Sequence, residues 1–322
     1  MKTALYAPWP EAARRSWGWA ALALVVLFYL AGALLYGVGQ LVWIVASRGA
    51  GVFADEAALE AALATLPPAG VLFALLLVQF LVWGGLTWLW LRAFERRGAA
   101  SIGMGPRQAG RRFFGGLFLS AAVLAALAVA VALIGLVFPV DIAGEVAAAD
   151  WGRLADPAVW LVFGAIALFF LLQGGIEEVV FRGWLMSTLA ARWGRTAGVI
   201  ATTLGFTLFH AHVLLAGLAN GLAGLAGIFM TGLFLALLAL RQGSIWGVIG
   251  LHGGFNALTL ISTLAVALAR SPETPLGALI VETFQRATGL EAGAAFQPQA
   301  LAQALVFALF SAVLIWRMPA RR

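Results

Sequence analysis

The sequence predicts an all-α, polytopic membrane protein of about eight transmembrane helices. Of its 322 residues, 63% are hydrophobic and only 11% are charged, whereas an average soluble domain is about 25% charged. Apolar runs of roughly 20 residues, the length that crosses the hydrocarbon core of a bilayer, recur along the whole chain. Residues 1–322 are therefore expected to form a single integral membrane domain.

Eight apolar runs define the predicted spans. They cover residues 17–46, 69–91, 113–138, 157–191, 196–218, 221–240, 244–268 and 299–317. The first run is longer than the apolar region of a signal peptide and is interpreted as a membrane helix. The fourth is too long for a perpendicular crossing. Its Gly174-Gly175 pair is expected to permit a kink or the close approach of another backbone.

The distribution of charge predicts the orientation. Fifteen of the twenty basic residues fall on one side of the eight spans and four on the other, where ten of the fourteen acidic residues also lie. The positive-inside rule then places both termini in the cytoplasm. The basic residues are interpreted as topology determinants and lipid-headgroup contacts rather than a nucleic-acid surface. The basic segment 92–112 is interpreted as a plain connector.

Three charged residues remain inside the predicted spans: Glu177, Glu178 and Arg182. Charges at this depth are costly and usually mark function. Glu178 and Arg182 are four residues apart on one helix face and can form an ion pair. Glu177 is rotated by about 100° and is left as a free general base or acid. The alternative is that the three charges only clamp neighbouring helices.

The histidines provide the second part of a candidate site. The chain has no cysteine, which excludes thiolate chemistry, and its histidines are His210, His212 and His252. Phe206 and His210 share one helix face, and so do His252 and Asn256, whose two hydrogen-bond donors suit a developing oxyanion. The alternative is that these residues only make hydrogen bonds between helices. His212 is expected to have a structural role.

Together, these motifs resemble those of the CAAX protease and bacteriocin-processing (CPBP) family of intramembrane glutamic proteases. They read Glu177-Glu178-Val-Val-Phe-Arg182, Phe206-Thr-Leu-Phe-His210 and His252-Gly-Gly-Phe-Asn256, in the family's order. The resemblance covers about residues 170–260, within the motif-bearing core helices 157–268. It implies an endopeptidase that hydrolyses a peptide bond of a peptide or membrane-protein substrate.

The resemblance also implies a role for each matched residue. Glu177 would activate the attacking water, and His210 would hold that water and assist proton transfer. His252 and Asn256 would form the oxyanion hole. The residues expected to support them are Glu178, Arg182 and Phe206. No cofactor and no metal are expected.

Further predictions concern the partners, the location and the alternative functions of the protein. The expected partners are the substrate and membrane lipids, with no nucleic acid, and the expected location is the plasma (inner) membrane of a bacterium. One alternative is a non-proteolytic membrane factor that acts in bacteriocin immunity or as a scaffold. Others are a zinc-dependent membrane protease, although no His-Glu-x-x-His is present, and a transporter that couples protons through Glu177.

Overall fold

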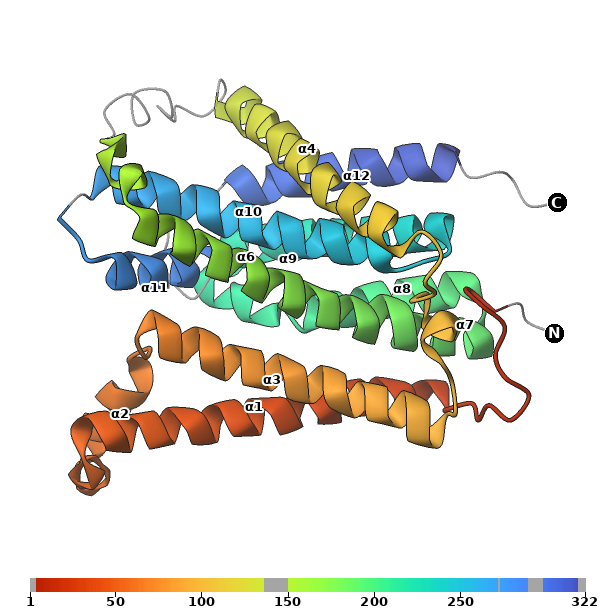
Figure 1. Ribbon diagram of the computed structural model, residues 1–322, viewed down its shortest axis with the longest axis horizontal. Helices are drawn as coiled ribbons and strands as arrows, with labels where there is room; N and C mark the ends of the chain where they lie inside the picture. The colour runs from red at the N-terminus through yellow and green to blue at the C-terminus, as the bar shows by residue number, and fades with distance from the viewer. Residues whose placement is uncertain (1–3, 136–149, 272, 289–297, 318–322) are drawn as a thin grey trace.

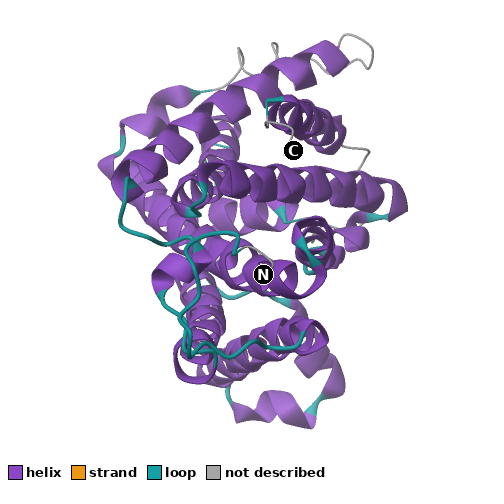
Figure 2. Ribbon diagram, turned by 90° about the vertical axis from the view of Figure 1, so that its right-hand side faces the viewer, coloured by secondary structure: helices purple, strands orange, loops and turns teal. Residues whose placement is uncertain are grey.

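The predicted all-α class is confirmed. The computed structural model describes residues 4–135, 150–271, 273–288 and 298–317, which are 84% helical and contain no strand. Figure 1 shows most of the long helices running along one axis and α4 crossing them obliquely, with α1 beginning and α12 ending at the same end of the bundle. Figure 2 looks onto that end, where loops cross the helix termini. Which side of a membrane this end faces stays a prediction.

The described elements alternate long helices with short helical turns. The long helices are α1 (Gly18–Arg48), α3 (Ala69–Leu89), α4 (Ala109–Gly135), α6 (Pro157–Glu178), α8 (Arg195–Leu208), α9 (Leu218–Gln242), α10 (Trp246–Arg270) and α12 (Pro298–Trp316). The shorter α-helices are α2 (Glu56–Ala64), α7 (Met186–Trp193) and α11 (Leu276–Ala287). The 3₁₀ segments are η1 (Ala50–Ala54), η3 (Ala99–Ile102), η4 (Trp151–Ala155) and η6 (Ala211–Ala216), and the π-helices are η2 (Trp90–Phe94) and η5 (Val179–Leu185).

Seven helices in the described part of the chain are long and apolar enough to cross a membrane. The sequence predicts about eight spans, and the count differs because of the predicted span 196–218. The helix there, α8, ends after 14 residues at Leu208, and 14 residues cover about 21 Å, less than the hydrocarbon core. His210 leaves the helical conformation, with φ −103° and ψ 14°, and the 3₁₀ turn η6 follows it. The predicted end of the third span, 136–138, lies outside the described residues.

Helix α10 lies at the centre of the bundle and packs against both α4 and α6. Its crossing with α6 is very close, because two glycines face each other there. A Cβ built on Gly174 would lie 2.9 Å from the backbone nitrogen of Gly253, and one built on Gly253 would lie 2.7 Å from Cα of Leu171. The glycines therefore allow the two backbones to approach, which is one of the two roles predicted for Gly174.

The long fourth span contains an irregularity, although not at the predicted position. Helix α6 continues without a break through the glycines to Glu178 and then widens into the π-helix η5, before α7 ends at Trp193. Short π segments inside α-helices are frequent at functional sites. The two glutamates thus stand directly before a widened turn.

The segment 92–112 is more than a connector. Glu95 and Arg97 are fully buried and form an ion pair of 2.9 Å. Arg97 also lies 3.7 Å above the ring of Trp9 and bonds to Ser187 on α7. Burial lowers the pKa of the Arg97 guanidinium, and the nearby Glu95 opposes that shift. The pair ties the segment that precedes α1 to the end of the long fourth span.

The same N-terminal segment reaches the π-helix directly. The hydroxyl of Tyr6 donates a hydrogen bond of 2.8 Å to the backbone carbonyl of Arg182. Burial raises the pKa of this hydroxyl, so it stays protonated and remains a donor. The chain before the first membrane helix therefore contacts the helix that carries the two glutamates.

Candidate active site

The predicted ion pair between Glu178 and Arg182 is present in the structure. Nη1 of Arg182 lies 2.8 Å from Oε1 of Glu178, and both side chains are fully buried. Nη2 of Arg182 donates to the carbonyl of Gly232 on α9 at 3.1 Å. A Cβ on Gly232 would lie 3.2 Å from that same nitrogen, so the glycine leaves room for the guanidinium. The pair thus links α6, η5 and α9.

His252 lies between the two carboxylates of α6. Its Nδ1 lies 2.7 Å from Oε1 of Glu178, and its Nε2 lies 3.7 Å from Oε2 of Glu177. A carboxylate only accepts hydrogen bonds, so Nδ1 carries the hydrogen when Glu178 is ionised. The 3.7 Å between Nε2 of His252 and Oε2 of Glu177 exceeds the length of a hydrogen bond. Glu178 therefore orients the imidazole, and Nε2 is directed to the side of Glu177.

Glu177 has a second neighbour that sequence reasoning missed. Nε2 of Gln173, one turn earlier on α6, donates to Oε1 of Glu177 at 2.5 Å. Oε1 of Gln173 accepts a bond of 3.3 Å from Nδ2 of Asn256 on α10. Among the described residues, Oε2 of Glu177 is buried and accepts no hydrogen bond. Gln173 was detectable as an amide four residues before Glu177 in an otherwise apolar span.

Phe206 connects His210 to this cluster. The Phe206 ring lies 4.7 Å from the His210 ring and 5.8 Å from the His252 ring, measured between centroids. The guanidinium of Arg182 lies 4.2 Å from the centroid of the same ring, a cation–π contact. Nδ1 of His210 lies 2.8 Å from the Phe206 carbonyl. Within the described part of the chain, no hydrogen bond joins His210 to Glu177.

The cluster holds ionisable groups in the buried interior of the bundle. Glu177 is 4% exposed and His252 is 5% exposed. Within the described ranges, no three His, Asp or Glu side chains are grouped so that they could hold a metal ion. A carboxylate with one free oxygen beside an oriented imidazole can transfer protons, and the amide of Asn256 adds a hydrogen-bond donor.

The fold and this site define a class: an all-α polytopic membrane protein with a buried acid–histidine cluster inside its helix bundle. The comparison with family models is more specific. Residues 158–258 match the family described as "Type II CAAX prenyl endopeptidase Rce1-like". The matched range begins in α6 and ends in α10, so it contains the whole cluster described above. The chain matches none of the curated proteins and none of the solved structures with which it was compared.

The resemblance predicted from the three motifs is thereby confirmed over residues 158–258. An Rce1-like domain supports an intramembrane protease of the CAAX type. The match does not extend to the roles of the individual residues or to the substrate.

Proposed function

We propose that this chain is a glutamic endopeptidase that hydrolyses a peptide bond of a membrane-associated or peptide substrate with water activated by Glu177. The observation that carries the proposal is the placement of His252, 2.7 Å from Glu178 and 3.7 Å from Glu177. This arrangement gives the two adjacent glutamates different tasks. Oε1 of Glu178 bonds to both Arg182 and His252, whereas Glu177 bonds to Gln173 alone and forms no hydrogen bond with a cation among the described residues. Each glutamate keeps a buried Oε2 without a hydrogen-bond partner among the described residues.

In the first step, Oε2 of Glu177 accepts a proton from water while the water oxygen attacks the carbonyl carbon of the scissile bond. The carbonyl oxygen becomes an oxyanion that accepts hydrogen bonds from His252 and Asn256. Asn256 has two N–H donors, so one is available while the other bonds to Gln173. His252 donates from Nε2 when its ring carries two protons. The positive charge of that ring then balances the net negative charge that the carboxylates of Glu177 and Glu178 and the guanidinium of Arg182 carry together.

In the second step, the tetrahedral intermediate collapses and the carbon–nitrogen bond breaks. The proton held by Glu177 passes to the leaving nitrogen, which yields an amine and a carboxylic acid. The carbonyl of Phe206 can only accept, so the hydrogen of His210 sits on Nδ1 and Nε2 is left as an acceptor. Nε2 of His210 can therefore accept a hydrogen bond from the second hydrogen of the attacking water. The chemistry uses no metal and no cofactor.

The proposal is tested by peptide cleavage with the purified protein in a lipid bilayer. Glu177→Gln is expected to abolish cleavage while the protein stays folded. Glu178→Gln is expected to destabilise the protein by about 3–5 kcal/mol, because it leaves Arg182 buried without its counter-ion. The matched control is Glu60→Gln, which neutralises an exposed glutamate on α2.

His210→Ala is compared with His212→Ala, a neighbouring histidine whose ring centroid lies 6.0 Å from that of His210. We expect cleavage to be lost in the first variant and kept in the second. Normal cleavage by Glu177→Gln or by His210→Ala would falsify the assigned roles. Loss of cleavage in the presence of a chelator, restored by zinc, would favour a metalloprotease. A cellular phenotype that survives Glu177→Gln would favour a non-proteolytic membrane factor.

A further inference from the structure

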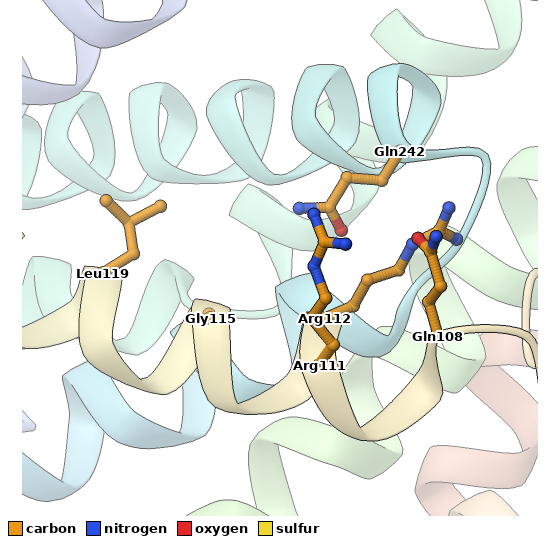
Figure 3. A pocket seen from close by; sticks show the side chains of 7 residues that line it. Gln108, Arg111, Arg112, Gly115, Leu119 and Gln242 are labelled. Atoms are coloured by element: carbon orange, nitrogen blue, oxygen red, sulfur yellow. The ribbon is translucent and has the colours of Figure 1, made fainter.

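A polar cavity lies at one end of the bundle, between the start of α4 and the end of α9, away from the glutamates. Its volume is about 340 Å³. It is lined by Gln108, Arg111, Arg112, Gly115, Gly116, Leu119 and Gln242. Figure 3 shows that the two guanidinium groups and the two side-chain amides lie around the same space. The candidate active site does not use these residues.

The cavity carries positive charge that the described protein does not neutralise. Neither Arg111 nor Arg112 forms an ion pair with a carboxylate among the described residues. The first turn of α4 contains no acidic residue. Both arginines lie there, at the positive end of the helix dipole, where further positive charge is unfavourable. A bound anion would neutralise the charge of the two arginines and would interact favourably with the positive end of the helix dipole.

Two amides refine the chemistry of the ligand. Gln242 lines the cavity, and its side-chain N–H groups can donate to a bound anion. Gln108 stands at the rim with φ 59°, a left-handed conformation that is costly for a residue with a side chain. The cavity therefore suits an anion that accepts hydrogen bonds from guanidinium and amide groups.

The wall of the cavity becomes apolar toward the middle of the bundle. From Arg111 to Leu119 the lining follows α4 for about 12 Å, past Gly115 and Gly116. The neighbouring side chains Phe114 and Phe118 are 56% and 76% exposed, as expected on a lipid-facing helix surface. A small soluble anion would make no use of this apolar wall, whereas an acyl chain would.

The geometry points to a binding site for an anionic phospholipid, such as phosphatidylglycerol. Its phosphate lies between Arg111 and Arg112, which can donate several charge-assisted hydrogen bonds. The amide of Gln242 donates to the same phosphate, and one acyl chain follows α4 past Gly115 to Leu119. The lipid would join the start of α4 to the end of α9.

The test measures binding of phosphatidylglycerol to the purified full-length protein in neutral detergent, by native mass spectrometry and thermal shift. Phosphatidylcholine and inorganic phosphate serve as the other two ligands. The variants are Arg111→Gln combined with Arg112→Gln, and Gly115→Leu, which fills the cavity. A Cβ on Gly115 meets no atom within 4 Å, so Gly115→Leu should fold.

Two matched controls lie outside the lining. Arg107→Gln removes one exposed charge from the same segment, and Gly110→Leu enlarges a glycine of α4 whose Cβ would also meet no atom within 4 Å. We expect affinity for phosphatidylglycerol to fall about tenfold or more in the double-arginine variant and in Gly115→Leu. Both controls should bind like the wild type.

Three results would overturn the proposal. One is equal stabilisation by phosphatidylcholine, which would mean that the anionic headgroup is not recognised. Another is equal stabilisation by inorganic phosphate, which would indicate a site for soluble anions. The third is an equal loss of affinity in Arg107→Gln, which would indicate general surface attraction. Since the readout is lipid affinity, the outcome does not depend on whether the proposed proteolysis is correct.

Discussion

Gly253 on α10 is the position where one added methyl group should disturb the site most. In Gly253→Ala, the new Cβ would lie 2.7 Å from Cα of Leu171 and 2.8 Å from the carbonyl oxygen of Phe170. Both are backbone atoms, so no side chain can move aside. Carbon atoms in contact prefer about 3.5–4.0 Å. Helices α6 and α10 must therefore separate by about 1 Å.

The separation of the two helices lengthens the hydrogen bond that lies next to their crossing. The bond from His252 to Glu178 measures 2.7 Å, and an added 1 Å would bring it beyond hydrogen-bond length. Losing a buried bond to a charged group costs about 1.5–3 kcal/mol, and overpacking costs about 1–3 kcal/mol more. A misplacement of this size can also slow a reaction by about a hundredfold.

The measurements are the free energy of unfolding and the rate of peptide cleavage, each relative to the wild type. Gly175→Ala is the matched control, because its Cβ would lie 3.4 Å from a methyl group of Ile249, an ordinary contact with a side chain. We expect a large loss in Gly253→Ala and a small one in Gly175→Ala. Equal stability and equal activity of the two variants would refute the close-crossing argument.

Three further predictions concern other parts of the structure. Tyr6→Phe should lower the free energy of unfolding by about 1 kcal/mol, because a carbonyl of the π-helix loses its donor; an unchanged denaturation curve would contradict this. Glu95→Gln should cost about 3–5 kcal/mol by leaving Arg97 buried without a carboxylate. The double variant Glu95→Leu with Arg97→Met should recover most of that stability, and equal losses in both would count against the ion pair. Gln173→Met should slow cleavage on the order of tenfold, since a bond to a charged group is worth about 1.5–3 kcal/mol, and a normal cleavage rate would rule out its positioning role.

Relations within one helix were predictable from the sequence. The ion pair between Glu178 and Arg182 follows from their spacing of four residues, which puts them on one helix face. The same rule placed His252 and Asn256 together, and in the structure both face α6. Such predictions succeed because the helical repeat alone determines them.

Relations between helices were harder to predict. Glu177 and Glu178 were expected to point in different directions, yet both lie close to His252, because the imidazole presents a nitrogen to each of them. Gln173 and Tyr6 were missed, since Gln173 is an uncharged residue within a span and Tyr6 precedes the first span, whereas the candidates were charged residues and histidines inside the spans. The end of α8 before His210 depends on local backbone angles that apolar periodicity does not report.

The π-helix after the glutamates has a consequence for comparing this chain with its relatives. One additional residue in a helix shifts everything beyond it by about 100° around the axis. Ser187 on α7, which contacts Arg97, therefore lies about 100° away from the position that an unbroken α-helix would give it relative to Glu177. A helical wheel drawn through the whole of 157–193 with a constant step of about 100° therefore misplaces the residues after the π-helix relative to those before it. Alignments of such sequences should accordingly tolerate a gap of a single residue within 179–185, where deletion would return the helix to its regular phase.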